Sequence, residues 1–180
     1  NAYCIHHLSD TPDKLLNIMD ECKKNGTENS VYIFASTSKI TFSGSGVAVM
    51  AASKENIAEM KKSMTVQTIG HDKLNMLRHV RFFGNKENVL SHMKKHSDII
   101  APKFDAVLSA LDKEIAPIGG CDWTKPNGGY FISFNAPEGC AKRIVELCKE
   151  AGVVLTGAGA TFPYGKDPDD KNIRIAPTYP

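Results

Sequence analysis

Lys39 is the residue of this sequence whose surroundings most clearly suggest chemistry. It stands in a run of small residues, with Ser36 and Ser38 before it and Gly44 and Gly46 after it. A lysine that forms an imine with an aldehyde must be neutral part of the time, and burial in apolar surroundings favours the neutral amine. Serine hydroxyls, and backbone N–H groups that glycines leave accessible, are suited to binding a phosphate. The stretch predicts a site for a phosphorylated aldehyde, with a strand-end lysine that reaches solvent as the simpler alternative.

Arg174 is a second candidate, close to the end of the sequence. Its guanidinium offers a planar two-point clamp that matches a carboxylate. The alternative is an arginine on the surface of a strand, the commoner place for a lone arginine. His92 and His96 are one helical turn apart, but no third ligand accompanies them. We predict no metal site and expect both histidines on a solvated helix face.

The elements around Lys39 alternate between strands and helices. Residues 31–36 and 47–52 are apolar and predict two buried strands, joined by the glycine-serine loop. Capping residues at 9–12 predict a helix that Asn25 and Gly26 close. Further helices are expected through residues 55–61 and from Asp72 to residue 80.

The second half of the sequence predicts a long helix followed by a small α+β unit. Helical periodicity runs from 86 to 115, and Pro102 is expected to kink or split that helix. A turn cluster at 125–129 follows. Strands are predicted at 130–134, 153–156 and 172–176, with a helix at 141–150.

Composition excludes several classes of protein. The chain has 180 residues and a formal net charge of +2, without a block of like charges, so we expect no nucleic-acid partner. No apolar run reaches the ~18 residues of a membrane helix, so we expect no membrane partner. Five scattered cysteines without a C-x-x-C pair favour a reducing, cytoplasmic setting. The sequence has no initiator Met and stops directly after a strand-like run, so we expect a fragment.

Four motifs carry a resemblance to a known family. The segment "STSK" at 36–39 resembles the cofactor-lysine segment of pyridoxal-phosphate-dependent aminotransferases of fold type I, class I/II, and in particular bacterial aspartate- or alanine-aminotransferase-like proteins. "NAY" at 1–3, "PNGGYF" at 126–131 and "NIRIAPT" at 172–178 are similar to further family segments, in the same order. The resemblance implies an α/β fold. Residues 1–85 would end the large cofactor-binding domain, a long kinked helix at 86–115 would connect, and 116–180 would form most of the small α+β domain.

The resemblance implies a role for each matching residue. Lys39 would bond to pyridoxal 5'-phosphate and later move a proton on the substrate. Tyr3 would donate a hydrogen bond to the ring oxygen of the cofactor, and Ser36, with Ser38 beside it, would bind the phosphate. Arg174 would hold the α-carboxylate of the substrate. The parent protein would transfer an amino group between an amino acid and a 2-oxo acid, as a homodimer.

The sequence also departs from the family pattern. The family usually has an arginine in a P-G-x-R-x-G loop after the lysine, whereas residues 43–47 read SGSGV. Arg78 or Arg81 are candidates for cofactor or substrate contacts, with an exposed helix face as the alternative. The family aspartate that pairs with the pyridine nitrogen would stand before Tyr3, outside this sequence. We therefore expect the chain by itself to be inactive.

Two other functions remain open at this point. One is an effector domain of a transcriptional regulator, which would resemble an aminotransferase and bind the cofactor without turnover. The other is a lyase that uses the same cofactor for β-elimination or decarboxylation.

Overall fold

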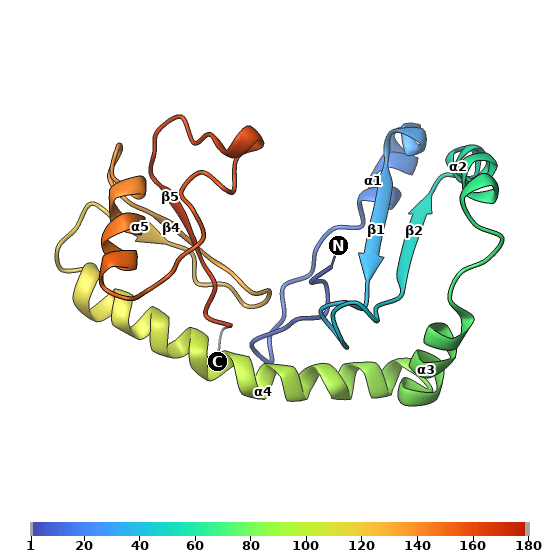
Figure 1. Cartoon of the computed structure of the whole chain (residues 1–180), viewed down its shortest axis with the longest axis horizontal. Helices are drawn as coiled ribbons and strands as arrows, with labels where there is room; N and C mark the ends of the chain where they lie inside the picture. The colour runs from blue at the N-terminus through green and yellow to red at the C-terminus, as the bar shows by residue number, and fades with distance from the viewer. Residues whose placement is uncertain (1, 179–180) are drawn as a thin grey trace. The chain divides into compact units, whose positions relative to one another are not determined.

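The computed structural model describes residues 2–178 and divides into two compact units (Figure 1). The first unit comprises the residues up to Ile5 together with Asp13–Lys94, and the second comprises His6–Pro12 and the residues from Lys95 on. Each unit contains both helices and an antiparallel sheet. The prediction of a mixed α/β protein, with an α+β arrangement in its C-terminal part, is confirmed.

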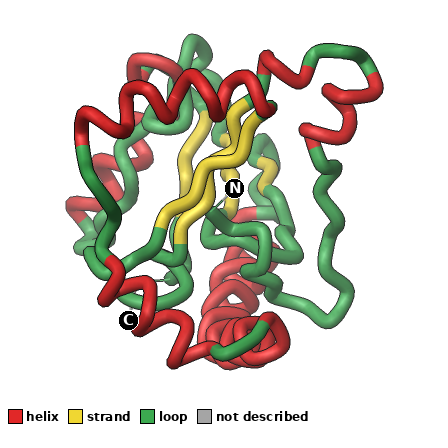
Figure 2. Tube along the Cα trace, turned by 90° about the vertical axis from the view of Figure 1, so that its right-hand side faces the viewer, coloured by secondary structure: helices red, strands yellow, loops and turns green. Residues whose placement is uncertain are grey.

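The sheet of the first unit is built from the two strands that flank the Lys39 loop. Strand β1 (Tyr32–Ser36) pairs antiparallel with β2 (Ala48–Ala52), and the strands are drawn in yellow in Figure 2. Ser36 lies opposite Ala48 at the loop end. Both strands lie where the sequence predicts them, to within a residue. Their predicted burial is wrong, because exposed residues alternate with half-buried ones along β1 and the sheet has two strands in the described part of the chain.

The first helix begins later than predicted. Helix α1 (Ile18–Lys24) starts after Asn17, whose side chain accepts a hydrogen bond from the backbone N–H of Met19. The predicted start at 9–12 is wrong, whereas the predicted end at Asn25 is confirmed. Leu15 and Leu16 are 73% and 84% exposed. Short helices depend on burying an apolar face, so these residues gain nothing from a helical conformation. A 3₁₀ turn, η1 (Glu28–Ser30), follows α1.

Two capped helices follow β2. Helix α2 (Lys54–Gln67) begins at the N-cap Ser53, and α3 (Lys73–Phe83) begins at the predicted N-cap, Asp72. In each case the cap side chain accepts a hydrogen bond from the backbone N–H three residues on. Such caps satisfy backbone donors that the first turn of a helix leaves without partners. Local sequence therefore fixes where α3 starts.

The long helix is continuous. Helix α4 (Lys86–Ala110) is followed directly by a π-helical turn, η2 (Leu111–Ile115). Pro102 lies inside α4 and does not split it, contrary to one form of the prediction. The ring is on the exposed side of the helix, where solvent can hydrogen-bond the carbonyl that loses its helical donor.

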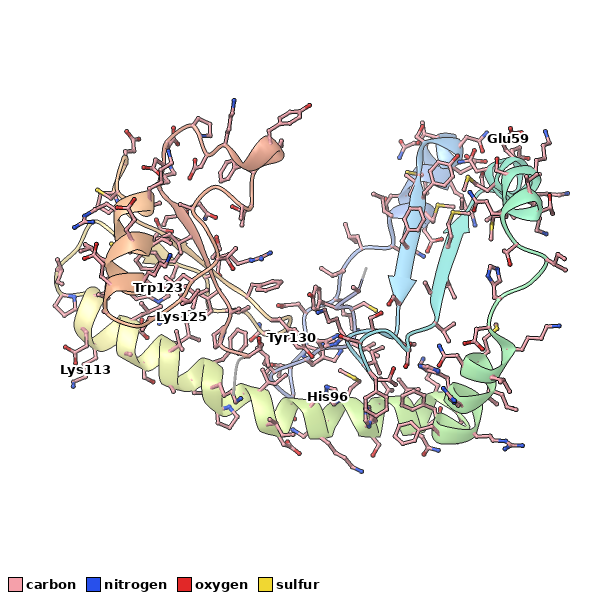
Figure 3. All side chains as sticks on the ribbon, in the orientation of Figure 1. Glu59, His96, Lys113, Trp123, Lys125 and Tyr130 are labelled. Atoms are coloured by element: carbon pink, nitrogen blue, oxygen red, sulfur yellow. The ribbon has the colours of Figure 1, made fainter. Side chains whose placement is uncertain are left out.

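The second unit contains a three-stranded antiparallel sheet in the order β3 (Asp122–Trp123), β4 (Ile132–Asn135), β5 (Asn172–Ile175). Helix α5 (Ala141–Glu150) packs against it through an apolar core that includes Phe134 and Ile173. The ring of Trp123, labelled in Figure 3, stacks on that of Phe134 with a centroid separation of 6.0 Å. A 3₁₀ turn, η3 (Pro163–Gly165), lies in the loop before β5.

One predicted strand is absent from this unit. Residues 153–156 have no regular secondary structure, although their sequence is apolar and β-branched. Val154 is 81% exposed, and Leu155 alone of these residues packs against the core. A strand requires a partner, and β3, β4 and β5 hydrogen-bond to one another instead. The strand β3 was not predicted, because two residues are too few to show a period.

The turn cluster at 125–129 is confirmed and has a defined partner. The backbone N–H of Gly129 donates to the carbonyl of His6 at 2.8 Å, and that of Leu8 donates to the carbonyl of Asn127 at 2.9 Å. A Cβ on Gly128 would lie 2.8 Å from the carbonyl oxygen of His6. A side chain at this position would therefore push the two segments apart.

Candidate functional site

Lys39 lies at the outside of a tight turn directly after β1. The backbone N–H groups of Ile40 and Thr41 both donate to the carbonyl of Thr37 at 2.9 Å, so the chain folds back around Lys39. Lys39 itself is exposed. The buried surroundings that the sequence predicts for this lysine are absent from the described residues, since β1 does not cover it.

The two predicted phosphate-binding serines lie beside each other in the same turn. The Oγ of Ser36 accepts the backbone N–H of Ser38 at 3.0 Å and donates its hydrogen to the Oγ of Ser38 at 2.7 Å. In this arrangement the Oγ of Ser38 accepts from Ser36, so its own hydrogen is not used in the bond between the two serines. Hydroxyl donors next to a lysine amine are a chemically suitable set for a ligand with a phosphate and an aldehyde. The residues present fit such a group.

The glycine of the loop allows a close approach to these serines. A Cβ on Gly46 would lie 2.6 Å from the Oγ of Ser38 and 3.1 Å from its backbone nitrogen. The loop is closed by two further bonds. The N–H of Thr37 donates to the carbonyl of Val47 at 3.0 Å, and the N–H of Val47 donates to the Oγ1 of Thr37 at 2.8 Å. Gly46 is thus needed for contact between the two ends of the loop.

Helix α3 supports the turn from one side through residues that the sequence analysis did not single out. The Nδ2 of Asn75 donates to the carbonyl of Gly46 at 3.1 Å. One turn later, the Nε2 of His79 lies 2.9 Å from the Oγ1 of Thr37 and 3.1 Å from the Oγ1 of Thr41. The signal in the sequence was the spacing of Asn75, His79 and Phe83, which places all three on one face of the helix. The two arginines of α3, Arg78 and Arg81, are exposed.

The turn is also anchored from α4. Ile40 is buried in a cluster with Phe83 and Met93. The Nε2 of His92 hydrogen-bonds the carbonyl of Ile40 at 2.9 Å. The expectation that His92 lies on a solvated helix face is therefore wrong, because its ring contacts protein on the side that faces the Lys39 turn.

Tyr3 and Arg174 are not part of this turn. Tyr3 is half-buried in a turn at the start of the first unit, the unit that also contains Ser36, Ser38 and Lys39. Arg174 belongs to the second unit and lies on β5 opposite Ser133 of β4. The structure thus groups three of the five predicted residues in a single turn.

The side chain of Arg174 is arranged as a receptor for an anion would be. Its guanidinium carbon lies 4.5 Å from the centroid of the Phe131 ring, which is a cation–π contact. Its Nε is buried and lacks a hydrogen-bond partner among residues 2–178. Since buried polar groups are nearly always paired, this donor is a position where an acceptor from a ligand would be stabilised.

A polar network on the same face of the sheet surrounds Arg174. The Nδ2 of Asn172 donates to the Oγ of Ser133 at 2.9 Å and to the Oδ1 of Asn135 at 2.8 Å, and its Oδ1 accepts the hydroxyl of Thr161 at 2.7 Å. Ser133, Asn135, Asn172 and Arg174 share this face, whereas Phe134 and Ile173 face the core. Asn172 therefore ties β4, β5 and the preceding loop together next to the arginine.

Asp167 fixes the start of β5. Its Oδ2 accepts the backbone N–H groups of Asn172 at 2.8 Å and Lys171 at 2.9 Å, and its Oδ1 accepts that of Asp169 at 3.1 Å. These bonds, first among them the one from Asn172, lower the pKa of the Asp167 carboxyl below its ordinary value. The ionised carboxylate thus holds the loop that leads to Arg174.

Within residues 2–178, no three or more His, Cys, Asp or Glu side chains are grouped as a metal ion would require. Among the same residues, none of the helices combines the length and the apolar character needed to cross a membrane.

Comparison with known proteins gives a match over the whole chain. The model of the aspartate amino-transferase family matches residues 1–180. A protein from Mycolicibacterium smegmatis, named as a candidate aminotransferase, is 47% identical over 180 residues. The match covers 100% of this chain and 42% of that protein, so the chain spans less than half the length of this relative.

Solved structures give the same result for the fold. The crystal structure of an aspartate transaminase from Corynebacterium glutamicum superposes with a TM-score of 0.95 at 43% identity, covering 100% of this chain and 42% of that one. An α-aminoadipate aminotransferase from Thermus thermophilus, complexed with N-(5'-phosphopyridoxyl)-L-leucine, gives a TM-score of 0.75 at 22% identity. That match covers 99% of this chain and 44% of that chain, and at this identity it speaks for the fold alone.

Proposed function

Because this chain belongs to the aspartate amino-transferase family, we propose that the protein containing it transfers an amino group between an amino acid and a 2-oxo acid. We propose pyridoxal 5'-phosphate as its cofactor. The observation that supports the proposal is the turn after β1, in which the hydrogen-bonded pair Ser36 and Ser38 directly precedes Lys39 in the chain. The resemblance of "STSK" at 36–39 to the cofactor-lysine segment of the family supports the choice of cofactor.

The proposal gives each predicted residue a task. Pyridoxal phosphate, when bound, supplies an electron sink for the bonds at the substrate α-carbon. The Nζ of Lys39 would hold the cofactor through its aldehyde carbon, with loss of water, and the same amine, displaced by the substrate amine, would act as the base that moves the proton of the substrate α-carbon. Ser36 and Ser38 bind the phosphate, and Tyr3 donates a hydrogen bond to the ring oxygen. Arg174 binds the α-carboxylate of the amino acid.

The wider assignment belongs to the same proposal. Residues 1–85 would complete a cofactor-binding domain, 86–115 would connect, and 116–180 would form most of a small domain. We propose that the whole protein acts as a homodimer in amino-acid metabolism and is cytoplasmic. All five cysteines are free in the structure, which suits a reducing compartment.

The test is to reduce the intact protein with borohydride in the presence of pyridoxal phosphate and to map the labelled lysine. We expect one label, at Lys39. Lys39→Ala should remove the label and abolish transamination, because the proposed base is then lost. Lys61→Ala is the matched control, since Lys61 is an exposed lysine on α2. Transamination that survives Lys39→Ala at a near-normal rate would refute the assignment.

Product analysis separates amino transfer from the alternatives. An aminotransferase converts equal amounts of amino acid and 2-oxo acid into the exchanged pair. A lyase would release ammonia or carbon dioxide, and a regulator's effector domain would bind the cofactor without turnover. The named relatives in the comparisons are aminotransferases, so neither alternative gains support from them.

A further inference from the structure

We propose that His79 is a positioning residue for Lys39. With the proton on Nδ1, the imidazole of His79 would hold Thr37, two residues before the lysine, through a hydrogen bond from the threonine hydroxyl to Nε2. This inference rests on the proposed function, because it concerns the lysine assigned there to the cofactor. No motif of the sequence pointed to it; the contacts come from segments 42 and 38 residues apart.

The hydrogen-bond partners of the imidazole determine its tautomer. The Nδ1 of His79 lies 2.8 Å from the backbone carbonyl of Asn75, one helical turn earlier. A carbonyl can only accept, so Nδ1 carries a proton. The Nε2 then acts as an acceptor in the neutral ring, and it faces two hydroxyls.

The hydroxyl hydrogens can all be placed when the ring is neutral. The Oγ1 of Thr37 accepts the N–H of Val47 at 2.8 Å and is free to donate its own hydrogen to the Nε2 of His79. The Oγ1 of Thr41 donates to the carbonyl of Thr37 at 3.1 Å. The hydroxyl of Thr37 therefore requires a hydrogen-bond acceptor at Nε2.

These contacts limit how the turn can move. Thr37 lies two residues before Lys39 and is fixed to the ring, and Thr41, two residues after Lys39, is fixed to the carbonyl of Thr37. The ring is fixed in turn to the backbone of α3. The base of the Lys39 side chain is thus held at both ends of its turn, while Lys39 itself stays exposed. A catalytic amine held in this way keeps a constant position relative to Ser36 and Ser38.

The experiment compares His79→Phe and His79→Gln in the intact protein loaded with pyridoxal phosphate. Phenylalanine keeps a ring of similar size without nitrogen, whereas the Oε1 of glutamine can take the place of the Nε2 acceptor. His71→Phe is the matched control, because His71 is exposed in the loop before α3. Three quantities are measured: kcat, KM, and hydrogen exchange at the backbone amides of Ile40, Thr41 and Val47.

We expect His79→Phe to lower kcat about tenfold with KM changed less than about twofold, because the lost bonds position the amine rather than bind substrate. Exchange at the three amides should rise about tenfold, by the same loss of local hydrogen bonding. His79→Gln should recover most of both effects, and His71→Phe should show neither. Unchanged exchange in His79→Phe, or an equal loss in His79→Gln, would overturn the proposal.

A second pair of variants covers the case in which His79→Phe does not fold. Thr37→Val removes the hydroxyl that donates to His79 and keeps the shape of the side chain, whereas Thr37→Ser keeps the hydroxyl. Faster exchange at Ile40 in the first and not in the second supports the proposal; equal exchange in both overturns it. Nitrogen-15 NMR of the ring at neutral pH should show His79 protonated on Nδ1 alone, and a proton on Nε2 would also overturn the proposal.

The failure of this inference can be told apart from the failure of the proposed function. If borohydride labels another lysine in the unmodified protein, the proposed role of Lys39 is wrong whatever the His79 variants do. If Lys39 is labelled and kcat and exchange are unchanged in His79→Phe, the function stands and the positioning role of His79 is wrong.

Discussion

Asn172 is the residue whose replacement should most directly weaken the sheet that carries Arg174. Its side chain makes three hydrogen bonds of 2.9, 2.8 and 2.7 Å to Ser133, Asn135 and Thr161. A neutral hydrogen bond contributes about 1 kcal/mol net, so we expect Asn172→Ala to lower the free energy of unfolding by about 2–3 kcal/mol. We expect no larger loss of unfolding free energy, because the partner side chains are partly exposed and water can replace some of the lost hydrogen bonds.

An isosteric change sharpens this prediction. Asn172→Asp keeps an acceptor for the Thr161 hydroxyl but puts an oxygen where Nδ2 faces the Oδ1 of Asn135 at 2.8 Å. Asn135 cannot simply turn its amide over, because its Nδ2 already donates to Asp122 at 2.9 Å. We therefore expect Asn172→Asp to destabilise the unit at least as much as the alanine variant.

The assay is urea unfolding of the 180-residue chain, followed by the fluorescence of Trp123. Trp123 is the single tryptophan of the chain and lies in the same sheet. Asn29→Ala is the matched control, because Asn29 is exposed in η1 and its side chain makes no hydrogen bond in the described part of the chain. We expect the control to change stability by less than about 0.5 kcal/mol. A change in Asn172→Ala no larger than that of the control would refute the reasoning.

Three other predictions concern the Lys39 loop, Arg174 and Asp167. Gly46→Ala should destabilise the Lys39 loop by about 1–3 kcal/mol, because the Cβ of the alanine would lie 2.6 Å from the Ser38 hydroxyl. The measurement is hydrogen exchange at the backbone amides of the loop, which should become faster. An unchanged exchange rate would contradict the prediction. In the intact protein, Arg174→Ala should raise the activation free energy that corresponds to kcat/KM for amino acids by about 2 kcal/mol or more, because a charge-assisted clamp is lost. The change should appear chiefly as a higher KM. Unchanged kinetics would show that another residue binds the carboxylate. The pKa of Asp167 is lowered in the folded chain, so its stabilising contribution is present above the unfolded pKa of about 3.9 and is lost as the pH falls through the lower folded value. Urea midpoints of the unmodified chain and of Asp167→Asn should therefore differ at neutral pH and converge in acid, and a constant difference would exclude this role.

Sequence patterns predicted best the elements whose signals are local. Asp72 caps α3 because its side chain reaches the N–H of a residue three positions on, a contact that no distant part of the chain can alter. The bounds of α5, Ala141–Glu150, also agree with the prediction, because Gly152 ends a strongly amphipathic stretch. The strands β4 and β5 were found through their alternation, since one face packs on the core and the other carries polar side chains.

The failures share a different cause, which is the dependence of an element on a partner. Residues 153–156 have the composition of a strand, but no strand of the second unit hydrogen-bonds to them. Leu15 and Leu16 have the spacing of a helix, but nothing in the described chain buries them. Burial of β1 was likewise inferred from its own composition, although burial depends on what lies against a strand.

The candidate site divides in the same way. The sequence by itself determined which residue types stand together near Lys39, because Ser36, Ser38 and Gly46 are neighbours along the chain. Only the tertiary structure decided what holds that turn in place, since His79 reaches Thr37 across 42 residues of sequence. The hydrogen bond between these distant segments depends on how α3 packs against the loop. A pattern of residue types along the chain does not show how close His79 and Thr37 lie in space.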